Sequence, residues 1–188
     1  MKRALAIYGS PRRDGVTSRL HDAFLSGLAG VEVTALRAYE LDIRPCTDCG
    51  SCRDEFACVH RDGMSGLYAA LRDCDLLSIS SPLYFSSPPA PLKAFIDRCQ
   101  VFWELGLREP GALRGKRGFF IAAGAGDYAG MFEPSVTVIR HYFNTLGCEF
   151  REEDFLLVRG TDGGLPDGSL DRARALGRKY SLYLNGGG

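Results

Sequence analysis

The chain has no excess of charge of either sign. Its 23 lysines and arginines balance its 23 aspartates and glutamates, so the formal net charge is zero. This balance argues against a nucleic-acid partner and against attraction to a membrane surface. It also disfavours an acidic electron shuttle, a class of protein that is steered to its partners by strong negative charge.

Long apolar runs are missing as well. No stretch approaches the roughly 18–20 apolar residues that a membrane span needs. The apolar run after Met1-Lys2-Arg3 stops at Gly9, which is too soon for a secretion signal. We therefore expect a cytoplasmic protein, in which the seven cysteines, an odd number, are free thiols or metal ligands rather than disulfides.

Two common nucleotide-binding motifs are absent from the N-terminal region, although its layout suits an anion. An apolar strand at residues 4–8 runs into the loop 9–18, and a helical pattern follows. The loop has neither the second glycine of G-x-G-x-x-G nor the Gly-Lys of a Walker A motif. Its hydroxyls, its guanidinium and the N–H groups of a helix start suit a terminal monophosphate such as that of FMN. The alternative is an ordinary loop with a Ser or Thr helix cap.

Strand-like and helix-like segments alternate along the chain, which predicts one α/β domain over residues 1–188. Strands are expected at 3–9, 31–39, 76–80, 118–123 and 149–158, and helices at 17–28, 63–73, 90–103, 133–146 and 169–184. This alternation predicts a five-stranded, doubly wound parallel sheet of flavodoxin-like order 2-1-3-4-5. Such a sheet binds its ligand at the carboxyl ends of strands one and three. The anion-binding loop follows the first of these strands.

Two more loops are expected to face the same crevice. Residues 81–91 follow the third strand and are rich in proline, which rigidifies a loop. Their backbone groups suit the hydrogen-bonding edge of an isoalloxazine ring, and Tyr84 and Phe85 would stack against that ring. Alternatively, the two aromatic side chains seal the core. After the fourth strand, Gly124 and Gly126 would let the backbone approach a flat ligand closely, or simply make the loop flexible.

Three motifs in this order resemble the NADPH-dependent FMN reductase family. They are Gly9-Ser10-Pro11-Arg12 with Gly15, Thr17 and Leu20, then Ser81-Pro82-Leu83-Tyr84-Phe85, then Leu92-Lys93-Ala94-Phe95-Ile96-Asp97-Arg98. The resemblance covers about residues 3–150 and implies a flavodoxin-like fold with bound FMN and NAD(P)H as co-substrate. It also implies a homodimer or homotetramer, for which Trp103 and residues 105–107 are a candidate contact surface.

The resemblance also implies roles for individual residues. The FMN phosphate would be held by Ser10, Arg12, Thr17 and Ser18. The ribityl chain and the ring would be contacted by Pro82, Leu83, Tyr84 and Phe85. Val16 departs from the small polar residue that is common before the threonine, which costs one possible contact. We assign no chemistry to Lys93 and Arg98, although both match the family.

A compact group of cysteines forms a loop, residues 46–58, after the second strand. It consists of Cys46, Cys49, Cys52 and Cys58. The spacing C-x2-C-x2-C, with a fourth cysteine soon after, is that by which one loop ligates a cubane cluster, whereas structural zinc usually takes two separated C-x2-C pairs. The segment is similar to that of the iron–sulfur flavoprotein branch of the same family, in which it binds a 4Fe–4S cluster near the flavin. Bare thiols and zinc remain as alternatives.

The predicted function is that of an FMN-dependent oxidoreductase. It would pass electrons from a nicotinamide nucleotide to a small-molecule or protein acceptor. No Ser-His-Asp order or carboxylate pair stands out, and none is needed, because the cofactor carries the chemistry. The alternative is an iron–sulfur flavoprotein or flavodoxin-type electron carrier without turnover of its own. The other cysteines, Cys74, Cys99 and Cys148, are expected in the core.

Overall fold

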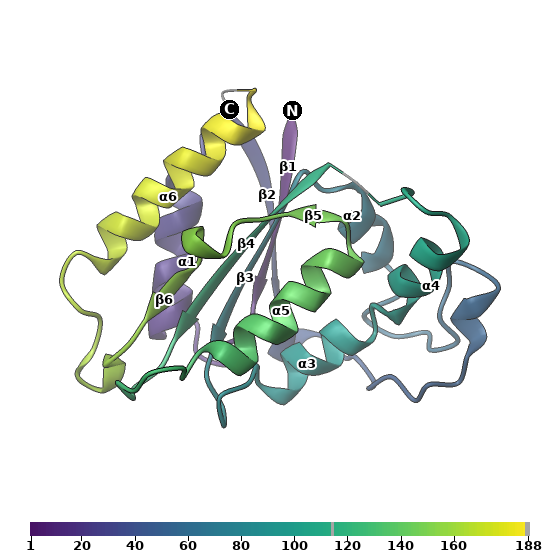
Figure 1. Cartoon of the computed structure of the whole chain (residues 1–188), viewed down its shortest axis with the longest axis horizontal. Coiled ribbons are helices and arrows are strands. Elements are labelled where there is room, and N and C mark those ends of the chain that lie inside the picture. Colours follow the sequence, from purple (N-terminus) through teal and green to yellow (C-terminus); the bar gives the residue numbers. More distant parts are fainter. Residues whose placement is uncertain (114, 187–188) are drawn as a thin grey trace.

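The computed structural model describes residues 1–113 and 115–186, so residues 114, 187 and 188 of the expected domain lie outside it. At its centre is a parallel sheet in the order β2-β1-β3-β4-β5, with β6 paired to β4 (Figure 1). The strands are β1 (Lys2–Tyr8), β2 (Val31–Arg37), β3 (Leu76–Pro82), β4 (Lys116–Ala123), β5 (Cys148–Glu149) and β6 (Leu156–Val158). The predicted order 2-1-3-4-5 is confirmed.

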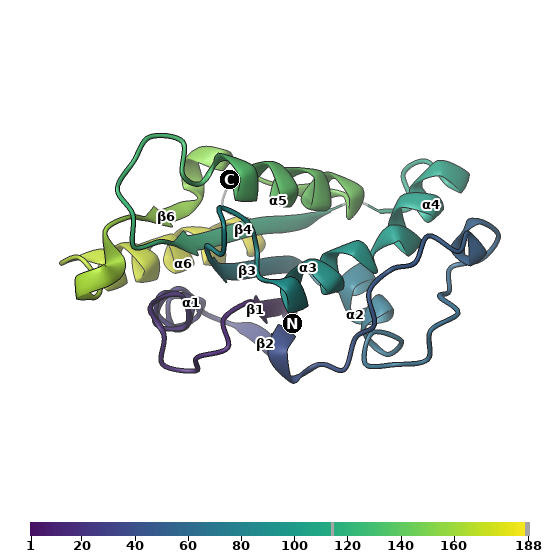
Figure 2. The same ribbon diagram turned by 90° about the horizontal axis from the view of Figure 1, so that it is seen from below.

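Helices cover both faces of the sheet. They are α1 (Val16–Ser26), α2 (Leu67–Asp73), α3 (Ala90–Asp97), α4 (Gln100–Arg108), α5 (Glu133–Thr145) and α6 (Ser169–Leu184). Figure 1 shows α1 and α6 on one side of the strands and α2 to α5 on the other. In Figure 2 the segment that carries the cysteines lies alongside α4, at the end of the molecule remote from α1. None of the helices in the described part is long and apolar enough to cross a membrane.

Two expected elements are interrupted. The helix expected at 90–103 ends at Asp97 and restarts at Gln100, because Arg98 and Cys99 form a tight turn in which the Cys99 N–H donates to the Ile96 carbonyl at 3.0 Å. The strand expected at 149–158 is split into β5 and β6 by a short 3₁₀ turn, Glu152–Asp154. In this turn Glu152 pairs with Arg140 of α5, and Asp154 pairs with Lys179 of α6.

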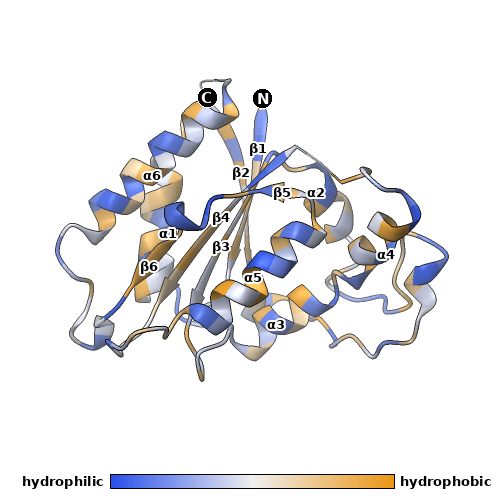
Figure 3. Cartoon of the chain, viewed as in Figure 1, coloured by the Kyte–Doolittle hydropathy of each residue, from blue (hydrophilic) through white to orange (hydrophobic). Residues whose placement is uncertain are grey.

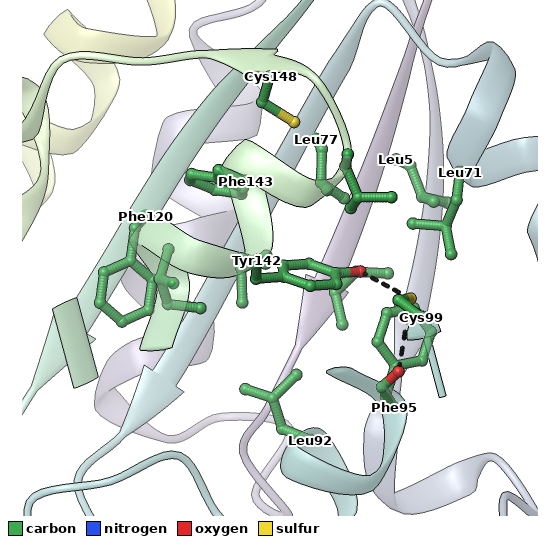
Figure 4. Close-up of a cluster of buried hydrophobic side chains, with 14 of the residues drawn as sticks. Leu5, Leu71, Leu77, Leu92, Phe95, Cys99, Phe120, Tyr142, Phe143 and Cys148 are labelled. Carbon is green, nitrogen blue, oxygen red and sulfur yellow. Dashed lines mark hydrogen bonds between the residues drawn. The ribbon is translucent and has the colours of Figure 1, made fainter. Parts of the chain in front are cut away.

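The helices present apolar faces to the sheet and polar faces outward, as the two colours along α5 and α6 show (Figure 3). The buried side chains form two clusters, one on each face. Cys74, Cys99 and Cys148 are buried in the larger cluster, which confirms their expected place in the core. Cys99 lies between the Tyr142 hydroxyl, at 3.5 Å, and the Phe95 carbonyl, at 3.6 Å (Figure 4).

The close packing of α1 on α6 depends on two glycines. A Cβ atom on Gly177 would lie 2.0 Å from the carbonyl oxygen of Phe24, and one on Gly27 would lie 2.3 Å from that of Arg174. We expect Gly177→Ala to lower the free energy of unfolding by about 1–3 kcal/mol, because backbone atoms must move apart. Denaturant unfolding measures this. Gly106→Ala in α4 is the matched control: its Cβ atom meets nothing within 4 Å, so it should stabilise by about 0.5–1 kcal/mol. Similar losses in both variants would contradict the packing argument.

His21 of α1 is buried against β3, between two serines. Its Nδ1 lies 3.0 Å from Ser80 Oγ and its Nε2 lies 2.8 Å from Ser78 Oγ. Burial, with a smaller contribution from Arg37, lowers the pKa of His21 from 6.5 to about 3. Between these values the unfolded chain binds a proton that the folded chain does not, so stability falls as the pH falls below about 6.5.

We expect the wild type to lose roughly 2–3 kcal/mol from His21 between pH 7.5 and pH 4.5. Urea unfolding at the two pH values measures the loss, and His21→Gln should show a smaller difference between them even if it is less stable at both. Asp62, whose pKa is lowered from 3.8 to about 2, titrates below this interval and does not obscure it. If His21→Gln lost as much stability between the two pH values as the wild type does, His21 would be ruled out as the source of the loss.

Candidate functional site

The loop between β1 and α1 is held by hydroxyl groups from both of its ends. The Arg12 N–H donates to Ser10 Oγ at 3.1 Å, and Ser18 Oγ donates to the Arg12 carbonyl at 2.8 Å. Ser10, Thr17 and Ser18 are buried, whereas Arg12 is exposed. The backbone of Arg12 is therefore fixed, while its guanidinium is free to meet a ligand.

The N-terminus of α1 has no side-chain cap. Gly15 is the N-cap residue, and no side chain among the described residues hydrogen-bonds to the helix start. The Ser or Thr cap considered from the sequence does not form, because Thr17 and Ser18 lie inside the helix. First-turn N–H groups without such a cap, beside buried hydroxyls, form the kind of cradle that a phosphate monoester fits.

Strand pairing brings the three expected loops to one edge of the sheet. Tyr8 of β1 is paired with Ser80 of β3, and Pro82 at the end of β3 with Ala123 at the end of β4. Across these ends, the Gly9 N–H donates to the Ser80 carbonyl at 2.7 Å and the Leu83 N–H donates to the Ala123 carbonyl at 3.2 Å. The loops that begin at residues 9, 83 and 124 therefore leave the sheet side by side.

The loop after β3 contains a two-residue turn. Tyr84 and Ser87 exchange backbone hydrogen bonds of 3.0 and 3.1 Å. Between them, Phe85 and Ser86 have φ values of 51° and 63°, as a type I′ turn requires. This left-handed conformation costs about 1–2 kcal/mol for each residue that is not glycine. The strained turn holds the Phe85 ring fully exposed to solvent.

Three polar side chains that sequence reasoning missed surround this turn. The Ser135 hydroxyl of α5 donates to the Ser86 carbonyl at 2.9 Å, and the Tyr128 hydroxyl lies 3.3 Å from Ser86 Oγ. Burial, followed by the neighbouring Tyr84 hydroxyl, raises the pKa of Tyr39. The signal that could have indicated Tyr39 is its place just past the carboxyl end of the second strand.

The glycines of the loop after β4 serve packing within the chain. A Cβ atom on Gly124 would lie 2.5 Å from Met131 Cε and 3.1 Å from Leu83 Cδ1. One on Gly126 would lie 3.1 Å from Tyr128 Cε1. Close approach of a flat ligand is therefore not needed to explain these two glycines.

The four cysteines of the loop 46–58 line one small cavity next to α4. It has a volume of about 20 Å³, which is room for about one water molecule. Arg108 of α4 fixes one wall, because its Nη1 donates to the Cys52 carbonyl at 2.8 Å and to the Arg53 carbonyl at 2.6 Å. Within the described residues, no three His, Cys, Asp or Glu side chains are grouped so that they could hold a metal ion. The thiols thus share a cavity without yet forming a ligand set.

A buried ion pair closes the base of the cysteine loop. Arg98 Nη1 donates to Asp62 Oδ2 at 2.6 Å and to the Arg44 carbonyl at 2.8 Å, and its Nη2 donates to Asp62 Oδ1 at 3.2 Å. Burial alone would raise the pKa of Asp62. Hydrogen bonds from Arg98 and from the N–H groups of Arg44 and Met64 outweigh burial and hold this pKa at about 2. Arg98 therefore has a structural role that its motif did not reveal.

The chain is similar to proteins of known family. Residues 2–149 match the family described as NADPH-dependent FMN reductase. An iron-sulfur flavoprotein of Archaeoglobus fulgidus is 36% identical over 134 residues, which is 70% of this chain and 57% of that protein. An iron-sulfur flavoprotein of Methanosarcina thermophila is 30% identical over 149 residues, covering 75% of this chain and 72% of that protein. The chain thus matches little more than half the length of the Archaeoglobus relative.

Solved structures share the fold. An archaeal flavodoxin superimposes with a TM-score of 0.59 at 16% identity, covering 97% of this chain and 99% of its own. An FMN-dependent NADH-azoreductase of Bacillus anthracis, in complex with FMN, gives 0.66 at 17% identity, covering 98% and 99%. These identities show the fold alone. The match over residues 2–149 shows that the chain belongs to the NADPH-dependent FMN reductase family.

Proposed function

We propose that this protein is an FMN-dependent NAD(P)H oxidoreductase. The observation that carries the proposal is the start of α1, which joins helix N–H groups without a side-chain cap to buried hydroxyls and a free guanidinium. The phosphate of FMN would bind Ser10, Arg12, Thr17 and Ser18. The ribityl chain and the ring would lie along Pro82, Leu83, Tyr84 and Phe85, with the backbone at Gly124 and Gly126 on the far side.

When bound, FMN supplies a ring that takes up a hydride equivalent and passes electrons on. The residues of the chain bind and orient it. Arg12 offers two parallel N–H donors to phosphate oxygens, and the helix N-terminus adds partial positive charge. The turn at residues 84–87 is fixed through Ser86 by Ser135 and Tyr128, so it presents a rigid wall to the ring. No general acid or base is required of the protein.

The partners we propose are a nicotinamide nucleotide as electron donor and a small molecule or protein as acceptor. We also propose that two or four copies of the chain associate. Trp103 and Leu107 of α4 are more than half exposed, and grooves of about 530 and 430 Å³ flank Trp103 between α4 and α5. Size measurement in solution, with Trp103→Glu as the variant expected to dissociate the assembly, tests this surface.

Flavin loading followed by turnover tests the proposed activity. FMN is titrated into the purified chain by following flavin fluorescence, and oxidation of NADH and NADPH is then measured with quinone, ferricyanide or oxygen as acceptor. We expect about one FMN per chain and steady oxidation of at least one nucleotide. Tight FMN binding without oxidation of either nucleotide would favour an electron carrier. Failure to bind FMN would overturn the proposal.

A second candidate is an iron–sulfur flavoprotein, in which Cys46, Cys49, Cys52 and Cys58 hold a 4Fe–4S cluster. Two observations favour it: all four thiols line one cavity, and relatives at 29–36% identity are named iron-sulfur flavoproteins. Four thiolates are the usual ligands of such a cluster. The thiols must converge before they can bind it. Iron and sulfide analysis after anaerobic purification tests this candidate, and negligible iron would reject it.

A further inference from the structure

Ser80 of β3 is hydrogen-bonded to the chain on both sides of the loop 9–18. Its carbonyl accepts a hydrogen bond from the N–H of Gly9, where the loop leaves β1, at 2.7 Å. Its hydroxyl lies 3.0 Å from Nδ1 of His21, in the second turn of α1. A Cβ atom on Gly9 would lie 2.8 Å from the Ser80 carbonyl oxygen, so the two strands approach closely here. The loop is therefore closed onto one residue of the neighbouring strand.

His21 makes a second contact to the same strand. Its Nε2 lies 2.8 Å from Ser78 Oγ, so both ring nitrogens are paired with β3. A neutral imidazole has one donor and one acceptor nitrogen, and a serine hydroxyl serves in either part, so the network is complete in both tautomers. All three side chains are fully buried. Apolar packing has no direction, whereas these hydrogen bonds require set distances and angles, and they fix α1 at one position along β3.

The same turn of α1 is also held to β1. The hydroxyl of Tyr8, the last residue of β1, donates to Asp22 Oδ1 at 2.5 Å. The centres of the Tyr8 and His21 rings are 4.4 Å apart. This turn of α1 is therefore tied by polar groups to the ends of both strands between which the candidate site lies.

The groups held in place by this network are those of the phosphate cradle. Thr17 and Ser18 precede His21 by four and three positions, so the three side chains share one face of α1, and all three are buried. A shift of α1 along β3 would move these two hydroxyls and the first-turn N–H groups relative to Gly9. Good N–H···O hydrogen bonds span only about 2.7–3.2 Å, so even a small shift would weaken several contacts to a phosphate at once.

We propose that His21 is a positioning residue for the phosphate of FMN, because through Ser78 and Ser80 it fixes the start of α1 against β3. The inference rests on the proposed oxidoreductase function, in which the same helix start binds FMN. Both ring nitrogens of His21 are occupied by serines. His21 therefore acts through the cradle residues and not by contact with the phosphate.

Comparison of FMN with riboflavin, which lacks the phosphate, isolates this effect. The dissociation constants of both flavins are measured by fluorescence titration of the full chain, and the ratio of riboflavin to FMN reports what the phosphate contributes. We expect wild type to bind FMN more tightly, and His21→Leu to reduce the ratio by about tenfold or more. Tenfold is about 1.4 kcal/mol, close to the contribution of one hydrogen bond to a charged group. A merely structural role would weaken the binding of both flavins alike.

Three further variants sharpen the result. His21→Asn returns an amide group near the place of Nδ1, so it should recover part of the ratio through Ser80. Ser80→Ala removes the hydroxyl and should lower the ratio as His21→Leu does; if His21→Leu does not fold, Ser80→Ala decides. Ser181→Ala is the matched control, because Ser181 Oγ is hydrogen-bonded to the N–H and carbonyl of Ala29, beyond the other end of α1, at 3.0 and 3.1 Å. It should leave the ratio unchanged.

A wild-type ratio in His21→Leu or in Ser80→Ala would overturn the inference while leaving FMN binding in place. A fall of the same size in Ser181→Ala would also overturn it, since any loosening of α1 would then suffice. A wild-type protein that binds no FMN would overturn the inference together with the proposed oxidoreductase. Equal affinity of the wild type for FMN and riboflavin would overturn the inference and the proposed phosphate site, but not flavin binding itself.

Discussion

Reversing the charge of Arg12 is expected to weaken FMN binding by roughly 100-fold or more. A hydrogen bond from a guanidinium to a phosphate contributes about 1.5–3 kcal/mol, and the new carboxylate would also repel the phosphate. A loss of about 2.7 kcal/mol of binding free energy corresponds to a 100-fold larger dissociation constant. Arg12 is exposed and forms no ion pair with any residue that the structure describes, so Arg12→Glu should not disturb the fold. Fluorescence titration with FMN at about 0.15 M salt measures the effect.

The next residue provides a matched control for Arg12. Arg13 lies in the same loop and has the same charge, but its guanidinium pairs with Glu40. We expect Arg13→Glu to change the dissociation constant for FMN by only a few-fold, because exposed charges are well screened. Equal losses of FMN affinity in the two variants would mean that positive charge near the loop, and not direct hydrogen bonds from the Arg12 guanidinium, holds the phosphate.

Removing the charge of Asp62 is expected to cost about 3–5 kcal/mol of stability, because Arg98 would remain charged and buried without a counterion. Asp62 and Arg98 have side chains that are 4% and 1% exposed, so solvent screens the pair little. Urea unfolding of Asp62→Asn at pH 7 measures the loss. The low pKa of Asp62 adds stability that is present above about pH 3.8 and is lost as the pH falls toward 2.

Two comparisons separate the contribution of the buried Asp62–Arg98 pair to stability from other effects of the substitution. Replacing both partners, as Asp62→Leu with Arg98→Met, should destabilise less than Asp62→Asn alone, since no charge is left buried. Asp97→Asn, which breaks an exposed pair with Lys93 in α3, should change stability by less than about 1 kcal/mol. A loss below about 1 kcal/mol for Asp62→Asn would show that the pair is not needed to hold the base of the cysteine loop.

The sequence was sufficient for the sheet order and for the edge at which the candidate site lies. Apolar strands that alternate with amphipathic helices have few arrangements open to them, because parallel strands need right-handed crossovers. Hydroxyls and an arginine directly after the first strand then place the proposed anion-binding loop at a known edge of the sheet. The cysteine spacing likewise identified the four thiols that share a cavity.

Only the tertiary structure decided how these parts are held together. The turn at Arg98 and Cys99, which splits the expected third helix, accompanies a buried contact between Arg98 and Asp62, 36 residues apart. The glycine at 177 is needed because the Phe24 carbonyl of another helix fills the space of its missing Cβ atom. Such contacts join residues that are distant along the chain, whereas periodicity and spacing report only on neighbours. The buried ion pair of Arg98 with Asp62 was for the same reason visible only once the chain was folded.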